Sequence, residues 1–319
     1  MQQISIFSPA MSLGPPRLPK GRTDSPAQRG RADARDLAER VSRAWHAERM
    51  PDGIHLPVGV VASLAQLADE PGTGETLREL APETLWRLLE RVWAVRWIEQ
   101  PELAAWAAPL HQWLMIQPSP AQARSAAAVA VAALDAGLLR LTGAPDPQAR
   151  READPLGAVL TTLRSKGARQ ANAEEHTPSD VAEVMARLAL GPGLPASGSL
   201  CEPTAGTGGL IRAAASHAAW AGQEVHAFEW AMNDADPLAA AGCASNALTW
   251  DLGPNVLVGC SDVLVTPEWP SRARLERAQI RARHAREVAD ARMLAGLRLL
   301  MAGPAPTAGQ ASPPRNRGD

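Results

Sequence analysis

The segment best suited to bind a ligand is residues 200–211, with the sequence LCEPTAGTGGLI. A short apolar stretch ends there in an acid and a proline, a Gly-x-Gly-Gly turn follows, and an amphipathic stretch begins directly after it. Glycines let a backbone turn tightly and approach a ligand closely, while the amides at a helix start attract a carboxylate or a phosphate. The segment therefore predicts a strand, a ligand-binding turn and a helix, although many α/β proteins need glycine at such a bend for structural reasons alone.

Acidic residues follow the next two predicted strands. Asp234 ends the second strand and can accept hydrogen bonds from ribose hydroxyls, whereas Glu229 is the competing ribose acid if that strand ends earlier. Asp262 follows the third strand and can reach an adenine amino group. Asp236 is predicted to cap a helix instead, because Pro237 follows it directly.

A helix with an apolar stripe precedes the glycine turn. It is predicted over residues 177–190, where Thr177 at the cap is followed by Pro178, an ordinary helix start that structure alone explains. Its position just before the glycine turn gives it functional interest. The apolar stripe consists of Val181, Val184, Met185 and Leu188.

These pieces, in this order, resemble the N-6 adenine-specific DNA methylase family, especially the modification subunit of type I restriction-modification systems. In that family a Thr-Pro helix precedes an Asp-Pro-x-x-Gly-x-Gly-Gly turn that binds S-adenosylmethionine, and Asp-x-Asp-Pro follows the second strand. The resemblance covers residues 174–264. It implies that S-adenosylmethionine is bound by Thr177, Pro178, Glu202, Pro203, Gly206, Thr207, Gly208, Gly209, Asp234 and Asp262.

The chain departs from this family at the motif that would hold the target base. The family places Asn-Pro-Pro-aromatic after its fourth strand, and no such tetrapeptide occurs in this sequence. Residues 266–269 (TPEW) hold a proline and an aromatic residue, but they follow Asp262 too closely for a fourth strand to intervene. Glu202 also replaces the usual aspartate. The catalytic residues are therefore unknown.

The resemblance implies an S-adenosylmethionine-binding protein of the adenine-specific DNA methyltransferase family, with DNA as its partner. It would be either a degenerate enzyme or one whose base pocket a second protein subunit completes. The alternative is a non-catalytic DNA-associated or regulatory module of a restriction-modification-like system, with an arginine-rich C-terminal helix on the phosphates. A small-molecule methyltransferase also needs only a Rossmann cofactor site, but the Thr-Pro helix argues against it.

The predicted fold class is α/β: a helical N-terminal domain, a truncated Rossmann-like methyltransferase domain with three parallel strands, and a C-terminal helix. Tryptophans at helical spacing in the N-terminal domain, Trp86, Trp93, Trp97, Trp106 and Trp113, are interpreted as core rather than as a base-stacking surface. The C-terminal helix is expected to cover the open edge of the sheet through its leucines. The predicted segments are a disordered tail (1–32), the helical domain (33–145), a linker with a short helix (146–173), the methyltransferase domain (174–269), the arginine-rich helix (270–302) and a second disordered tail (303–319).

Composition limits the remaining function classes. The formal net charge is −2, so any DNA contact must be local. Cys201, Cys243 and Cys260 lie far apart without a CxxC pair, which predicts neither a metal site nor a disulfide framework. No stretch is apolar for long enough to span a membrane, and the N-terminus lacks a signal-peptide pattern. We therefore expect a cytoplasmic protein without a membrane partner.

Overall fold

The computed structural model describes residues 26–48, 53–164, 177–191 and 196–302. The helical part comprises α1 (Pro26–Ala47), α2 (His55–Leu64), α3 (Thr73–Arg78), α4 (Pro82–Glu99), α5 (Pro101–Trp106), α6 (Ala108–His111), the 3-10 helix η1 (Gln112–Met115), α7 (Pro120–Asp135), α8 (Leu138–Thr142), α9 (Pro147–Arg150) and α10 (Pro155–Leu163). The remainder comprises α12 (Ser179–Leu190), β1 (Gly198–Glu202), α13 (Gly209–Trp220), the 3-10 helix η2 (Val225–Ala227), β2 (Phe228–Asp234), α14 (Pro237–Thr249), β3 (Val256–Cys260) and α15 (Trp269–Ala302).

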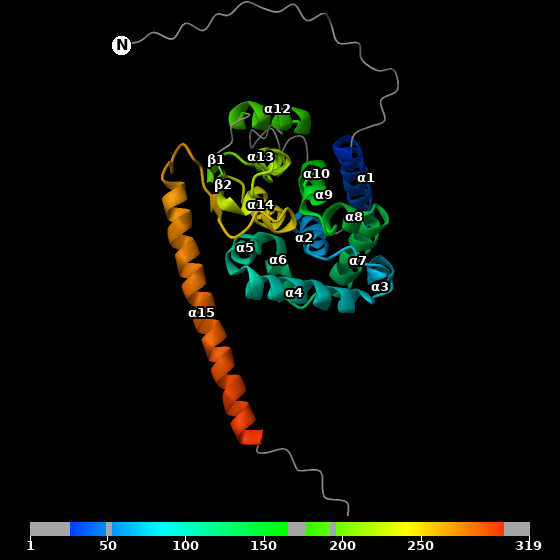
Figure 1. Ribbon diagram of the computed structural model, residues 1–319. Coiled ribbons are helices and arrows are strands. Elements are labelled where there is room, and N and C mark those ends of the chain that lie inside the picture. The colour runs from blue at the N-terminus through cyan, green and yellow to red at the C-terminus, as the bar shows by residue number, and fades with distance from the viewer. Residues whose placement is uncertain (1–25, 49–52, 165–176, 192–195, 303–319) are drawn as a thin grey trace, which may run out of the picture.

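The three strands form one parallel sheet in the order β1-β2-β3, with Glu202 paired to Met232 and Asp234 paired to Cys260. Figure 1 shows α12, α13 and α14 in one layer on one face of this sheet, with α15 on the other side. The helical part packs against the outside of that layer. A mixed α/β fold with a small parallel sheet is therefore confirmed, while its identity as a methyltransferase fold stays a prediction.

The sheet has two buried faces because side chains alternate along β2 and β3. Phe228, Trp230 and Met232 belong to the large core that includes α13 and α14. Ala231, between them, belongs to a small second core that also contains Leu257 of β3 and Trp269 and Ala273 of α15. The apolar run of β3 and the apolar middle of β2 follow from this two-sided burial, whereas β1 is largely exposed.

The tryptophan-rich helices form the core of the helical part. Trp86, Trp93 and Trp113 are buried, as predicted, and the rings of Trp86 and Trp113 meet edge to face at 4.6 Å. Trp97 and Trp106 are only half-buried. The buried residues of the helical part and of the α13/α14 layer make one continuous hydrophobic cluster.

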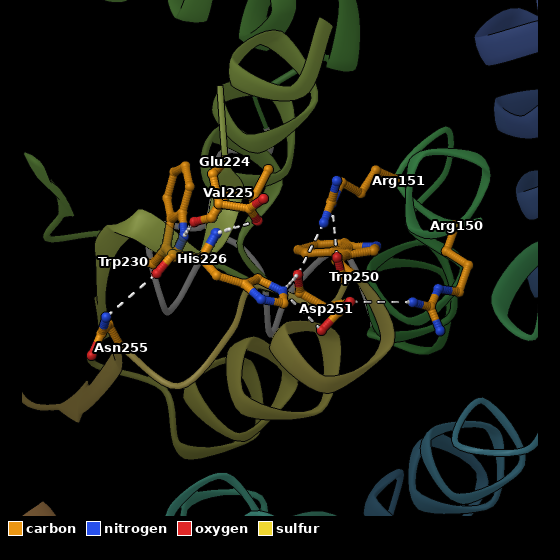
Figure 2. A network of polar contacts seen from close by, with 9 residues as sticks. All are labelled: Arg150, Arg151, Glu224, Val225, His226, Trp230, Trp250, Asp251 and Asn255. Carbon is orange, nitrogen blue, oxygen red and sulfur yellow. Dashed lines mark hydrogen bonds and ion pairs between the residues drawn. The ribbon is translucent and has the colours of Figure 1, made fainter. Parts of the chain in front are cut away.

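A buried arginine joins the helical part to the end of α14 (Figure 2). Arg151 donates from Nε to the carbonyl of Trp250 (2.7 Å) and from a guanidinium nitrogen to the carbonyl of Asp251 (2.9 Å). Asp251 has φ of 51°, which turns its carbonyl toward this donor and its carboxylate toward His226 Nε2 at 3.1 Å. The carbonyl of Arg151 in turn accepts from Arg212 of α13 (2.6 Å). The predicted linker thus contains packed helices, α9 and α10, on both sides of this joint.

The expectation that α15 covers the open sheet edge is wrong. The helix lies against β3 and α5, not against β1, and its buried residues are Trp269, Ala273 and Ile280. The leucines expected to pack inward are exposed: Leu275 by 62%, Leu294 by 53% and Leu297 by 48%, while Val288 is half-buried and the side chain of Leu300 lies outside the described residues. α15 contacts α4 as far along as Glu287, which accepts from Trp97 Nε1 at 3.0 Å, and its remaining C-terminal end extends away from the body (Figure 1).

The N-terminal helix begins earlier in the chain than the sequence predicts. α1 begins at Pro26, inside the segment 1–32 predicted to be disordered, because a proline suits a first helical turn and Arg31 pairs with Glu183 of α12 at 2.8 Å. Residues 1–25, 165–173 and 303–319 of the predicted tails and linker lie outside the described residues. Among those described, no helix is both long and apolar enough to cross a membrane.

Candidate functional site

The glycine turn connects β1 to α13 at the carboxyl edge of the sheet. Gly206 (φ 57°) and Gly208 (φ 98°) both have left-handed backbone conformations, which favour glycine. A Cβ on Gly208 would lie 3.1 Å from the ring of Trp250 and 3.3 Å from the sulfur of Met232, whereas one on Gly209 would meet no atom within 4 Å. Gly208 therefore faces the core, and Gly209 faces open space at the start of α13.

Asp234 binds the glycine turn directly. Its Oδ2 accepts from the amide of Gly206 (2.8 Å), and its Oδ1 accepts from the amide of Asp236 (2.9 Å). Glu229 lies at the opposite end of β2, where it pairs with Arg274 of α15 (2.6 Å) and accepts from Ser199. Burial raises the pKa of Glu229, but Arg274, Ser199 and Arg277 together outweigh burial and leave that pKa lowered. Of the two competing acids, Asp234 is the one beside the turn.

Thr207 fastens the turn to the helical part. Its hydroxyl donates to Asp154 at the start of α10 (2.6 Å), and its carbonyl accepts from Asn246 of α14 (2.9 Å). Asp154 also accepts from Asn246 (3.0 Å) and from the amide of Gly157 (2.8 Å). Thr207 is 2% exposed, so this residue supports the turn from behind and does not face a ligand.

Asn233 bridges the loops that follow the outer two strands. Its side-chain amide donates to the carbonyls of Pro203 (3.0 Å) and Ser261 (2.8 Å), and its backbone carbonyl accepts from Ala205 (2.8 Å). Asp262 comes next to Ser261 but is exposed, and its carboxylate accepts from the amide of Leu264 (2.9 Å) in a local turn. The structure thus holds the glycine turn and the Asp262 loop along one edge.

The other predicted site residues surround the turn less closely. Glu202 ends β1 half-buried and accepts from the amide and hydroxyl of Thr204 (3.2 Å each), and Pro203 is exposed. Thr177 and Pro178 are exposed at the start of α12, which begins at Ser179 without a side-chain cap and packs on α13. The predicted Thr177 cap is therefore wrong, because Pro178 occupies the N-cap position.

Acidic side chains and the first-turn amides of a helix both lie around the turn. Burial raises the pKa of the Cys243 thiol, and Asp234, Asp154 and Glu202 raise it further, so the surroundings are electronegative. Cys243 contacts the carbonyl of Gly206 at 3.1 Å. The first-turn amides of α13, by contrast, have no partners within the helix and attract a negative group.

Several residues that build this site escape detection in the sequence. Asp154, Asn233, Asn246 and Trp250 hold the turn in place, but all four lie outside β1 and α13, the two elements that flank it. Among these four residues, only Asp154 has a recognisable pattern, because Pro155 follows it at the start of α10. That pattern predicts a helix cap but not a contact with the glycine turn.

Comparisons of the chain with known protein families and with curated proteins give no match. The family resemblance consequently depends on the motifs of the chain and on the geometry of the turn.

Proposed function

We propose that the glycine turn binds S-adenosylmethionine and that the chain is a cofactor-binding member of the adenine-specific (N6) DNA methyltransferase family. The observation that carries this proposal is the pairing of the Asp234 carboxylate with the Gly206 amide. It brings an acid from the end of β2 beside a left-handed glycine turn after β1, as adenosine-binding α/β sites require.

The residues of the site fit the two charges of this cofactor. Asp234 would accept from the ribose hydroxyls, and the first-turn amides of α13 would hold the carboxylate of the methionine moiety. Asp262, in the loop after β3, would reach the adenine amino group. The acids around the turn favour the sulfonium, through which this cofactor supplies an electrophilic methyl group.

Calorimetric titration with S-adenosylmethionine and with its demethylated product tests the site. Gly209→Val places a branched side chain at the turn, at a position where the added Cβ has no atom within 4 Å. We expect it to weaken binding at least about tenfold, or 1.4 kcal/mol. Gly74→Val, at the half-buried start of α3, is the control and should bind like the wild type, because its Cβ meets only the flexible end of Arg78 at 3.2 Å. Equal affinity of all three proteins, or no binding by the wild type, would refute the proposal.

We further propose that methylation of DNA requires a second protein subunit that completes the base pocket. A flipped adenine needs an acceptor for its amino proton and an in-line approach to the sulfonium, and the chain lacks the Asn-Pro-Pro-aromatic motif of the family. The purified chain should therefore incorporate no radiolabelled methyl into adenine-containing duplex DNA. Robust N6-methyladenine formation that Gly209→Val abolishes would show that the single chain builds a base pocket.

A second candidate function is DNA association through α15 without catalysis, and the exposure of its far half favours it. Residues 272–298 contain eight arginines against three acids, and Arg286, Arg292 and Arg298 are exposed. Binding to phosphates would weaken steeply between low and moderate salt. A gel-shift titration at two salt concentrations checks this, with replacement of all three arginines by glutamine expected to abolish the shift. Methylation of DNA and non-catalytic association with DNA both predict a cytoplasmic location for the protein.

A further inference from the structure

A pocket of about 510 Å³ lies between α9, α12 and α13, and none of its lining residues belongs to the glycine turn. Small-molecule sites in proteins have volumes of about 300–1,000 Å³, so this pocket is large enough for a ligand. α13 contributes side chains at helical spacing on one face: Arg212, Ala213, Ser216, His217 and Trp220.

Arg212 is a buried cation of this pocket. The residue is 3% exposed, and one guanidinium nitrogen donates to the carbonyl of Arg151 at 2.6 Å, while Nε has no partner among the described residues. Burial lowers the pKa of Arg212, and Asp154 and Glu183 oppose this only through longer-range attraction. A buried guanidinium without a paired acid is costly, so a negative group bound beside it would be stabilised.

Three more buried polar atoms of the pocket residues lack a partner in the described part of the chain. They are Gln148 Oε1, Ser216 Oγ and His217 Nε2. Buried polar atoms nearly always have a hydrogen-bond partner, so four such atoms around one pocket indicate a place where a polar ligand binds. Rotation about the side-chain torsions would turn these atoms into the pocket.

The pocket carries more positive than negative charge. Its ionised lining residues are three arginines and two glutamates: Arg151, Arg187, Arg212, Glu152 and Glu183. Glu183 already pairs with Arg31 at 2.8 Å, which leaves the three guanidinium groups with Glu152 alone. Burial raises the pKa of the Glu152 carboxyl and so disfavours its negative form. Guanidinium groups match the oxygens of a phosphate in both charge and geometry.

An aromatic ring borders the same pocket. Trp220, the last residue of α13, lines the pocket and is 83% exposed. Its ring stacks with that of His217, with 6.3 Å between the centroids and 24° between the planes. The open face of an exposed tryptophan can stack on a nucleobase. The pocket therefore combines a place for an anion with a place for a planar ring.

We propose that this pocket binds a nucleoside monophosphate, with the phosphate between Arg187 and Arg212 and the base on Trp220. This site is separate from the glycine turn, so the inference goes beyond the proposed function. Residues 192–195, which connect α12 to β1 outside the described residues, are Pro-Gly-Leu-Pro and contain no acid that could replace the phosphate.

Calorimetric titration of the full chain with inosine 5′-monophosphate tests the site, with inosine and inorganic phosphate as the two halves of the probe. Inosine lacks the amino group that Asp262 would reach in adenine, and the experiment contains no S-adenosylmethionine. The result is therefore distinguishable from success or failure of the cofactor site. The variants are Arg187→Gln and Trp220→Ala, both at exposed positions, and the control is Arg124→Gln at an exposed position of α7.

We expect the wild type to bind the nucleotide at least tenfold more tightly than inosine or phosphate, and each pocket variant to bind it at least tenfold more weakly. Arg124→Gln and the ring-preserving Trp220→Phe should bind like the wild type. Matching circular dichroism and thermal melting would show that all variants are folded.

No binding by the wild type, equal binding by the pocket variants and the control, or equal affinity for phosphate and nucleotide would each overturn the proposal. Binding that appears only in Glu174→Gln/Glu175→Gln would also overturn it, because it would assign the pocket to carboxylates of the chain itself.

Discussion

Gly208 and Gly209 are neighbours in the chain, yet alanine should affect them in opposite ways. At Gly208 the backbone has φ of 98° and ψ of 22°, and a methyl group would meet the ring of Trp250 at 3.1 Å and the sulfur of Met232 at 3.3 Å. At Gly209, the first residue of α13, a methyl group meets nothing within 4 Å. Comparing the two alanine variants therefore separates the effect of strain in the turn from the effect of replacing a glycine.

The expected magnitudes follow from these surroundings. A left-handed conformation costs a non-glycine residue about 1–2 kcal/mol. Crowding against a buried ring and sulfur adds about 1–3 kcal/mol, so Gly208→Ala should lower the free energy of unfolding by roughly 2–5 kcal/mol. Gly209→Ala should raise it by about 0.4–1 kcal/mol, because alanine restricts the unfolded chain at a position where the folded conformation tolerates it.

Equilibrium unfolding in urea, followed by circular dichroism, measures both changes as shifts of the midpoint at constant slope. The wild type should unfold between the two variants. Equal midpoints for Gly208→Ala and the wild type, or a larger loss at Gly209 than at Gly208, would show that Gly208 does not lie in a left-handed conformation against Trp250.

Two other predictions concern basic side chains that are removed from solvent, Arg151 and His111. Arg151→Met should destabilise the protein by about 3 kcal/mol, because it leaves the carbonyls of Trp250 and Asp251 without their charged donor. Thermal melting measures this loss, with Arg40→Met at an exposed position as the control. A loss no larger than that of the control would contradict the prediction. Burial lowers the pKa of His111, although its bond to the carbonyl of Ala104 opposes this. The unfolded chain therefore takes up this proton first, and stability should fall as the pH drops through the unfolded value of about 6.5, until the folded group also titrates. His111→Gln should flatten that part of the curve of unfolding free energy against pH, and an unchanged slope would rule out the assignment.

The elements of the sheet could be predicted because their signals are local. Residues 256–260 are a continuous apolar run followed by polar residues, and β3 has those bounds. Asp236 was predicted to cap a helix, and its side chain indeed accepts from the amides of Leu238 and Ala239 at the start of α14. Each of these features involves neighbours within a few residues, where pattern and propensity suffice.

The supports of the candidate site could not be predicted in this way. The bond between Thr207 and Asp154 joins residues 53 positions apart, and nothing in either local sequence indicates the other. α15 shows a different difficulty: its leucines have helical spacing on an apparent apolar face, but small Ala273 and the ring of Trp269 are what fit against Ala231 and Leu257. Which face of a helix is buried depends on the shape of the surface that receives it.

The fluorescence of Trp250, whose ring lies behind Gly208, can report on the conformation of the turn. Trp250 is fully buried, and its ring lies close enough to Gly208 that a shift of the turn by a fraction of an ångström changes the surroundings of the indole. The chain contains ten tryptophans, so the contribution of this one is isolated as the difference in emission between the wild type and Trp250→Phe. That difference signal would report movement of the glycine turn in solution, including any movement that a bound ligand imposes, without a label and without a measurement of turnover.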